Sequence, residues 1–441
     1  MLNAKLVLSA AFIGIILCLS GSPTVANEPA RLRFDVLHYN ITIEPDIPRK
    51  TLSGSVVIRF ASNTANLTQV EFDCGNLEIE TVKQAGASRQ FSVKDHRLAV
   101  SIPAMRARAV TELEIKYHGA PKYGIRFFPD SSQVYTIFST SQWTVCVDAP
   151  EDRATLSLTL VVPTKLTAIS NGGLVSQRPV ADQKTASTWK QTSAIPTYIF
   201  GFAAGPYRII REKKYGVEFQ YLVTSFNDDE AHRIFRDTAD MLKFYEERSG
   251  VRYADKTYGQ VLAAGGAEQE MSSFTALNEA YGKGVLANEQ DQWLGAHEFA
   301  HQWWGNMVTC REWNHFWLNE GIATFIAAAY LEHRFGRQVY LHEIEQYRGN
   351  YEKVRAAGKD KSLVFPDWLH PTREDRTLVY DKGAYVMHLL REEMGEEAFW
   401  KGLKIYTKRF FGKSVVTSDF EKAMKEATPK NLDQFFAKWV Y

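Results

Sequence analysis

The sequence reads His297-Glu-Phe-Ala-His301, and Glu320 follows after eighteen intervening residues. Two histidines four positions apart lie on the same face of one helical turn, so both imidazoles can bind a single metal ion. Glu298 is a candidate general base beside that face, and Glu320 is a candidate third ligand from a later helix. Three protein ligands leave the fourth coordination position to water, which predicts a catalytic zinc site rather than a structural one.

The predicted ligands His297, His301 and Glu320 also indicate the chemistry. Two neutral imidazoles and one carboxylate leave a net positive charge on a divalent ion, which lowers the pKa of bound water towards about 7. The ion then makes a nucleophile at neutral pH and polarises the carbonyl that is attacked. Glu298 would accept the proton of that water and deliver it to the leaving amine. We expect one Zn2+ per chain, although cobalt or manganese would also fit this ligand set.

Composition limits the class of protein. A chain of 441 residues with 45% hydrophobic and 23% charged residues is long enough for two or three globular domains. The 52 Lys and Arg residues are balanced by 51 Asp and Glu residues. There is therefore no basic field for a nucleic-acid partner, and none is expected.

The N-terminus resembles an export signal. Lys5 is followed by an apolar run over residues 6–19, and small residues precede a cleavage position after Ala26. The alternative is a membrane anchor, but the run is shorter than the roughly twenty residues needed to span a bilayer. We expect a signal peptide over residues 1–26, a periplasmic or secreted protein, and no stable membrane anchor after the signal is removed.

Three cysteines remain outside the predicted signal: Cys74, Cys146 and Cys310. An odd number allows one disulfide at most and leaves a free thiol. Cys74 and Cys146 both lie in the strand-rich half, and whether they pair is left open. The preferred N-terminal residue of a substrate and the oligomeric state are likewise not determined by the sequence.

Hydrophobic patterning divides the chain near residue 206. Residues 27–206 contain short runs of alternating apolar and polar residues, which predict a largely antiparallel β domain. Residues 207–441 combine two further strands with many helices and form the predicted catalytic domain, so the fold class is α+β with several domains. The strands expected lie at residues 39–43, 54–60, 112–117, 154–162, 217–223 and 259–264, with a tight turn at 170–173 and one helix from 228 to 250.

The residues around the motif resemble the M1 family of zinc aminopeptidases, a gluzincin family that includes aminopeptidase N and leukotriene A4 hydrolase. The resemblance rests on residues 298–305 and 317–324, on the strand opening at Asp35, and on the element at 146–154. It implies an N-terminal antiparallel β saddle-like domain followed by a thermolysin-like, mainly helical catalytic domain.

The resemblance also implies a short form. The sequence ends at Tyr441, where most family members continue into a helical domain that covers the active site. We therefore expect an open site, or a homo-oligomer in which another subunit covers it. The length limit for peptide substrates is left open.

Residues 265–269 resemble the family's Gly-x-Met-Glu-Asn motif. Gly265 and Gly266 allow a backbone to approach closely, and Ala267 stands where the family has Met. We expect Glu268 to bind the free amino group of the substrate through a charge-assisted hydrogen bond. Glu270 is expected to point to the opposite side of this extended segment.

Tyr380 lies sixty residues beyond Glu320 in a Tyr-Asp-Lys-Gly-Ala segment. On an apolar helix face a tyrosine is ordinarily a core residue. The resemblance, however, places a tyrosine that stabilises the transition state at this spacing, and such a donor contributes about 3 kcal/mol.

The function expected is a zinc aminopeptidase that hydrolyses N-terminal residues from peptides with a free N-terminus. Three alternatives remain: a zinc endopeptidase with an open cleft, an epoxide hydrolase of the leukotriene A4 hydrolase kind, and a catalytically silent peptide-binding protein. Cleavage of N-acetylated peptides would favour the endopeptidase, and binding without turnover at saturating zinc would favour the silent protein.

Overall fold

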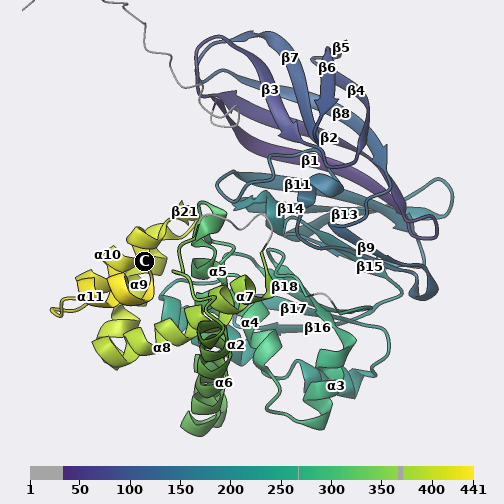
Figure 1. Ribbon diagram of the computed structural model, residues 1–441. Coiled ribbons are helices and arrows are strands. Elements are labelled where there is room, and N and C mark those ends of the chain that lie inside the picture. Colours follow the sequence, from purple (N-terminus) through teal and green to yellow (C-terminus); the bar gives the residue numbers. More distant parts are fainter. Residues whose placement is uncertain (1–32, 267, 366–370) are drawn as a thin grey trace, which may run out of the picture.

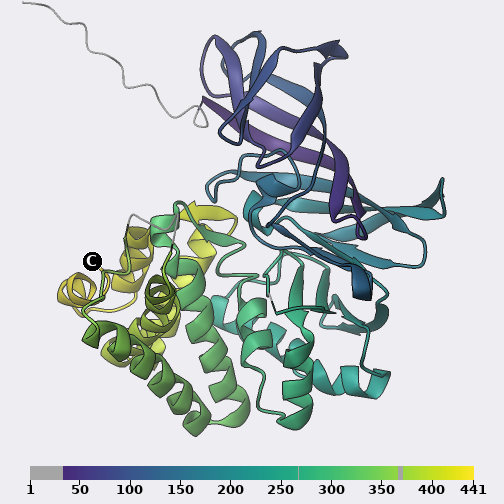
Figure 2. The same ribbon diagram turned by 45° about the vertical axis from the view of Figure 1, so that its right-hand side comes forward.

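The structure is a computed structural model that describes residues 33–266, 268–365 and 371–441. The predicted signal peptide over residues 1–26 and Ala267 lie outside the described residues. Figures 1 and 2 show a strand-rich half stacked on a half that contains all the long helices. The chain enters the helical half after the strand that ends at Gly205.

The strand-rich half is built on an eight-stranded sheet of order β13-β14-β11-β1-β2-β8-β4-β5. All neighbouring pairs in it are antiparallel except β1 and β11, which run parallel. Smaller sheets have the orders β3-β7-β6 and β12-β15-β10-β9. The strands are β1 Phe34–Asp46, β2 Thr51–Ser62, β3 Leu67–Asp73, β4 Glu78–Gln84, β5 Ala87–Ser88, β6 Phe91–Lys94, β7 Arg97–Met105, β8 Val110–Gly119, β9 Ile125–Phe128, β10 Gln133–Thr136, β11 Arg153–Pro163, β12 Thr167–Ser170, β13 Gly173–Val180, β14 Lys184–Pro196 and β15 Phe202–Gly205.

The alternation of buried and half-buried side chains explains why these residues form strands. In β11, every second side chain from Ala154 to Val162 is buried, and the residues between them are half-buried. Successive side chains of a strand point to opposite faces, so this pattern places one face of the sheet on the core. The predicted antiparallel β domain is confirmed, with the parallel β1–β11 pair as the exception.

The second half begins with a four-stranded sheet of order β16-β17-β18-β19. The β16–β17 pair is antiparallel and the next two pairs are parallel. The strands are β16 Arg208–Lys214, β17 Val217–Val223, β18 Thr257–Ala263, β19 Phe274–Asn278, and a separate pair β20 Val308–Cys310 and β21 Lys413–Val415. The helices are α1 Asp228–Ile234, α2 Thr238–Ser249, α3 Glu279–Ala287, α4 Trp293–Ala300, α5 Trp317–Phe335, α6 Arg337–Ala356, α7 Arg373–Thr377, α8 Gly383–Met394, α9 Glu396–Phe410, α10 Thr417–Glu426 and α11 Asp433–Trp439.

The single helix expected from residue 228 to Gly250 is two helices, so that prediction was wrong. Phe235 follows the last residue of α1, and its ring stacks on Tyr221 of the sheet with 4.5 Å between ring centroids. This contact ends the helix. Asp237 then accepts a hydrogen bond from Arg334 Nε at 3.0 Å. Gly250 does end the second helix, in the left-handed conformation (φ 69°) that suits glycine.

Helix α5 is the centre of the helical half. Fifteen of its 19 residues, from Trp317 to Leu331, are buried, because α4, α6 and α8 pack around it. At the α5–α8 contact two glycines meet: a Cβ on Gly321 would lie 2.9 Å from the Cα of Gly383. Only glycine at both positions allows the two backbones to lie this close.

The described residues include no helix with both the length and the apolar character needed to cross a membrane. Cys74, Cys146 and Cys310 are buried free thiols, so the structure shows no disulfide between the first two. Burial raises the pKa of Cys74 to about 11, which keeps this thiol protonated at neutral pH.

Gly383→Ala tests the close contact of α5 and α8. The new methyl group would overlap the backbone at Gly321, so we expect a loss of about 1–3 kcal/mol in the free energy of unfolding, measured by denaturant titration. Gly349→Ala in α6 is the matched control, because a Cβ there meets no atom within 4 Å. That control should gain up to about 1 kcal/mol from helix propensity. Equal effects at the two positions would contradict the packing argument.

Candidate metal centre

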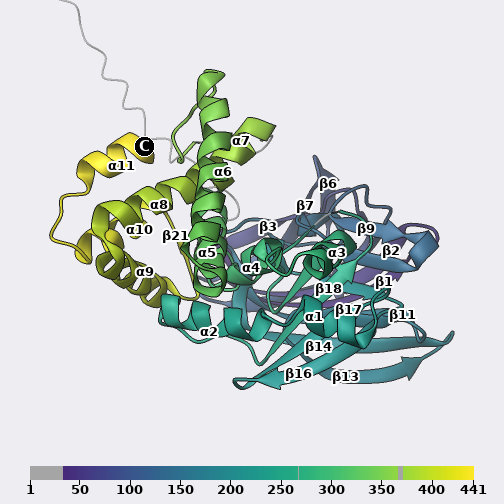
Figure 3. The same ribbon diagram turned by 90° about the horizontal axis from the view of Figure 1, so that it is seen from below.

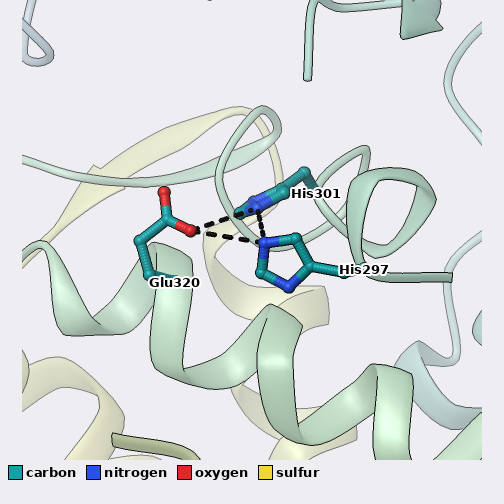
Figure 4. Close-up of side chains that lie close together, drawn as sticks. All are labelled: His297, His301 and Glu320. Carbon is teal, nitrogen blue, oxygen red and sulfur yellow. Dashed lines mark hydrogen bonds and ion pairs between the residues drawn. The ribbon is translucent and has the colours of Figure 1, made fainter. Parts of the chain in front are cut away.

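Three buried side chains from two helices converge on one point. His297 Nε2 and His301 Nε2 lie 3.0 Å apart, and Glu320 Oε2 lies 3.5 Å from the first and 3.4 Å from the second (Figure 4). The imidazoles come from the end of α4 and the carboxylate from the first turn of α5. Within the described parts of the chain this is the one group of at least three His, Cys, Asp or Glu side chains whose ligand atoms come close enough to hold a metal ion.

Electrostatics at this point favour a cation. Although burial alone would raise it, the pKa of Glu320 is held at about 2, chiefly by the facing His301. The same contact raises the pKa of His301 to about 10 against the effect of burial, whereas burial lowers the pKa of His297 to about 4. The site therefore holds a carboxylate anion that needs a buried positive charge, and two nitrogens with a carboxylate oxygen are donors that fit a divalent metal ion.

Outer contacts fix both imidazoles. His301 Nδ1 lies 3.0 Å from the Trp304 carbonyl oxygen, to which it donates, so Nε2 is left as the ligand atom. His297 Nδ1 lies 3.4 Å from Thr324 Oγ1. Gly305, at φ 133°, makes the turn behind His301, because a Cβ there would lie 2.7 Å from the imidazole Nδ1.

Glu298 is buried beside the three ligands. Its Oε2 is shielded from solvent and has no hydrogen-bond partner among the described residues. Burial raises the pKa of this carboxyl well above its usual range, and the neighbouring Glu270 adds to the effect. An unpartnered oxygen beside a metal centre is suited to accept a proton from a bound molecule.

Tyr380 reaches the centre from a π-helical turn, Leu378–Lys382, that precedes α8. Its ring centroid lies 6.0 Å from that of His297, and its hydroxyl interacts with the Glu320 carboxylate. Burial, helped by the nearby carboxylates, raises the pKa of the phenol well above 10, so Tyr380 is a hydrogen-bond donor. A single wide turn of this kind often re-aims a side chain at a functional site.

The segment expected to bind the substrate runs past the centre between β18 and β19. Gly265 and Gly266 follow β18, which ends at Ala263, and Ala267 lies outside the described residues. The Glu268 carboxylate accepts a hydrogen bond from Asn278 Nδ2. Glu268 is half-buried and contributes a weak electrostatic interaction to Glu298, so it lies at the edge of the centre.

Glu270 lies deeper than Glu268, and its predicted orientation was wrong. Residues two apart in an extended segment point to the same side, so the two carboxylates share a face. Glu270 is buried, its Oε1 has no partner among the described residues, and its charge interacts with His301 and Glu320. Burial raises the pKa of Glu270 to about 7. The period-two rule itself would have identified this residue.

Two amides after α4 hold this segment against the centre. Gln302 Nε2 donates to the Met271 carbonyl at 3.0 Å, and Gln302 Oε1 accepts from the Ser273 backbone N–H at 2.8 Å. Asn306 Nδ2 donates to the Glu270 carbonyl at 2.9 Å. The metal ligands and the substrate segment are therefore fixed relative to each other by two residues for which the sequence alone predicted no role.

The strand-rich half contributes one tyrosine to this frame. Tyr198 OH donates to the Gly305 carbonyl at 2.9 Å and accepts from Asn319 Nδ2 at 3.1 Å. Asn319 Oδ1 in turn accepts from the Cys310 backbone N–H at 2.9 Å. Asn319, the neighbour of Glu320, thus connects both halves of the molecule.

Two sequence profiles of one family match the chain. The Peptidase M1 N-terminal domain matches residues 36–199, and the Peptidase family M1 domain matches residues 235–439, including all three candidate ligands. The chain belongs to peptidase family M1.

Relatives of this M1 family member agree with the assignment. Aminopeptidase N of Lactococcus lactis is 27% identical over 91% of the chain and 50% of its own length, and the puromycin-sensitive aminopeptidase of Caenorhabditis elegans is 24% identical over 95% and 48%. The chain thus spans about half the length of the relatives that it matches. Among solved structures, an M1 zinc metallopeptidase from Deinococcus radiodurans has a TM-score of 0.77 at 23% identity, covering 92% of this chain and 94% of that one. Yeast LTA4 hydrolase has a TM-score of 0.81 at 20% identity, covering 93% and 68%. These likenesses show the M1 fold.

Glu320→Ala tests the metal centre. Removal of the only carboxylate of the three ligands should weaken zinc binding by more than the roughly 10- to 100-fold that the loss of an outer partner costs. The measurement is the metal content of the purified protein after dialysis against buffered free zinc, by mass spectrometry. Glu345→Ala, at an exposed ion pair on α6, is the control and should retain the metal. Equal zinc contents in both variants would contradict this ligand set.

Proposed function

We propose that this protein is a zinc-dependent aminopeptidase that hydrolyses the N-terminal residue of peptides, with one Zn2+ per chain. The observation that carries the proposal is the convergence of His297, His301 and Glu320 beside the unpartnered carboxylate of Glu298. Two imidazoles and one carboxylate are the ligand set of catalytic zinc sites, which keep one position for water or substrate.

The relatives support this substrate class. The relatives from Lactococcus lactis and Caenorhabditis elegans are named aminopeptidases, and a mutant of the Deinococcus radiodurans M1 zinc metallopeptidase has been crystallised with a Tyr-Ser-Ala substrate. Because the chain covers about half of the aminopeptidases that it matches, these activities are support for the proposal rather than properties of this protein.

The residues around the metal centre would have separate roles in the reaction. Zinc, when bound by the three ligands, lowers the pKa of a coordinated water and polarises the carbonyl to be attacked. Glu298 Oε2 accepts the proton of the attacking water and passes it to the nitrogen of the leaving group. The protonated Tyr380 hydroxyl donates a hydrogen bond to the oxygen on which negative charge develops, an effect of about 3 kcal/mol.

Two carboxylates are available for the free amino group of the substrate. Glu268 lies at the edge of the centre and Glu270 lies within it, on the same side of one extended segment. An ammonium group held by this pair gains charge-assisted hydrogen bonds and relieves the repulsion between buried acids. We propose that the pair acts as the amine site, with Glu268 as predicted from the sequence and Glu270 added to it.

Location and assembly are separate proposals. The N-terminal sequence supports export to the periplasm or the medium, and this is tested by whether residues 1–26 are absent from the mature protein. A homo-oligomer in which a second subunit covers the site is tested by the molar mass in solution.

The requirement for a free amine on the substrate distinguishes the aminopeptidase from the endopeptidase and from the catalytically silent peptide-binding protein. We expect zinc-dependent turnover of aminoacyl-fluorophores with a free amine, and a loss of at least about 100-fold when the amine is acetylated. Glu298→Gln should lower kcat by about 100- to 10,000-fold while the zinc content is unchanged. Glu397→Gln, on the exposed face of α9, is the control. Equal rates on acetylated substrates would favour the endopeptidase, and zinc-loaded protein without turnover would favour the peptide-binding protein.

Glu268→Gln and Glu270→Gln, made separately, test the amine site. Each should raise KM for free-amine substrates more than it lowers kcat, because a neutral amide no longer pairs with the ammonium group. We expect the larger increase, about tenfold or more, for Glu270, whose carboxylate is buried. The measurement is kcat and KM on aminoacyl-fluorophores. A normal KM in both variants would contradict the proposed site.

A further inference from the structure

Two arginines of α7 have no charged partner among the described residues. Arg373 and Arg376 are exposed, and neither guanidinium makes a hydrogen bond or ion pair within the described ranges 33–266, 268–365 and 371–441. The two acids of the same helix, Glu374 and Asp375, are each paired with a lysine at 2.5 Å. The positive charges of α7 are therefore available to a ligand, whereas its negative charges are not.

These arginines border the candidate active site. A cavity of about 400 Å3 is lined by Tyr380 and Arg376 together with Phe138 and Tyr198. A second cavity, of about 320 Å3, is lined by Tyr380 and both α7 arginines. Tyr380 and Arg376 line both cavities, and Tyr380 is the residue that faces the metal centre. Figures 1 and 3 place α7 against α6.

The two cavities differ in what they adjoin. The first includes Phe138, whose backbone N–H donates to Gln269 Oε1 at 2.7 Å, so it adjoins the segment that carries Glu268 and Glu270. The second is lined by none of the described residues of that segment. It is lined instead by Trp293, which stacks on the His297 imidazole with 5.0 Å between ring centroids.

The difference between the two cavities predicts the direction in which a peptide substrate binds. If the amine of the substrate is held by the Glu268–Glu270 pair and the first carbonyl lies at the metal centre, the side chain of the first residue enters the cavity next to Phe138. The residue after the cleaved bond then continues away from the amine site, into the cavity beside Trp293. Arg373 and Arg376 line that second cavity.

We propose that Arg373 and Arg376 form a carboxylate-binding subsite for the leaving part of the peptide, which makes short peptides with a free C-terminus the preferred substrates. This inference rests on the proposed aminopeptidase function and deepens it. A guanidinium binds a carboxylate through two parallel hydrogen bonds, and two unpaired guanidiniums three positions apart lie on one face of the helix.

Reach limits the peptide length. One extended residue spans about 3.3–3.6 Å, and the second cavity is lined by Tyr380, so we expect the terminal carboxylate to enter it when one or two residues follow the cleaved bond. Asp381 also lines this cavity, but its Oδ1 accepts a hydrogen bond from Asn350 Nδ2 at 2.9 Å. The two guanidiniums leave the cavity with a net positive charge, which favours an anionic group.

Two groups of a peptide can supply the carboxylate that binds to the arginines: its C-terminus, or the acidic side chain of the residue after the cleaved bond. Two substrate pairs distinguish them: a dipeptide as free acid and as amide, and a tripeptide amide with Asp or Asn in the second position. The first residue in all four is the one most active as an aminoacyl-fluorophore. We expect kcat/KM for the free dipeptide to exceed that for its amide by about tenfold or more.

The Arg373→Gln/Arg376→Gln double variant should bring the ratio of free acid to amide close to 1. Arg355→Gln, at an exposed ion pair with Glu352 on α6, is the matched control and should keep the wild-type ratio. Arg376→Lys, which keeps the charge but loses the paired hydrogen bonds, should give an intermediate ratio. Circular dichroism and the melting temperature verify that the variants are folded.

Each outcome has one meaning. A wild-type ratio near 1 for both substrate pairs, in an enzyme that hydrolyses aminoacyl-fluorophores, overturns the subsite but leaves the proposed function intact. A high ratio that persists in the double variant overturns the assignment to α7. A preference for Asp over Asn alone supports the arginines but identifies the side chain as the source of the carboxylate. Absence of turnover on every free-amine substrate overturns the proposed function itself.

Discussion

The structure of the centre depends on one buried carboxylate, that of Glu320, which faces the imidazoles of His297 and His301. Removal of an ionised carboxylate from water costs several kcal/mol, and only opposite charge and hydrogen bonds offset that cost. Helices α4 and α5 can therefore pack with Glu320 inside only if the imidazoles, and a cation held with them, meet it. The apolar packing around α5 supplies the stability, and the charged group specifies the arrangement.

Further contacts position Tyr380 and the segment with Glu270 around the metal ligands. Gly321 lets α8 approach α5 closely, so the π turn before α8 carries Tyr380 to the same point. On the other side, Gln302 and Asn306 hold the segment with Glu270. Gln302 and Asn306 both bond to backbone atoms of residues 270–273, and Tyr380 bonds to the Glu320 carboxylate. A displacement of any one element would therefore alter the distance between the metal ligands and the groups proposed to act on the substrate.

The two cavities near the metal centre differ in the charged groups beside them. This difference is the basis of the proposed preference for short peptides. One cavity adjoins the acidic segment at residues 268–270, and the other is lined by both arginines of α7, of which Arg376 also lines the first. A short peptide carries a positive charge at its N-terminus and a negative charge at its C-terminus. The acidic segment beside the first cavity and the pair of arginines at the second match that polarity, which would orient the peptide before cleavage.

The sequence by itself determined what depends on local spacing. The spacing of four positions from His297 to His301 fixes a common helix face, and the alternation of apolar and polar residues fixes the strands of the β domain. Family resemblance gave Tyr380 a role that spacing alone leaves open. Only the tertiary structure decided the break between α1 and α2, the depth of Glu270, and the meeting of Arg376 with Tyr380 at two cavities. Such features depend on contacts between residues far apart in the chain, and neither helix periodicity nor strand alternation contains that information.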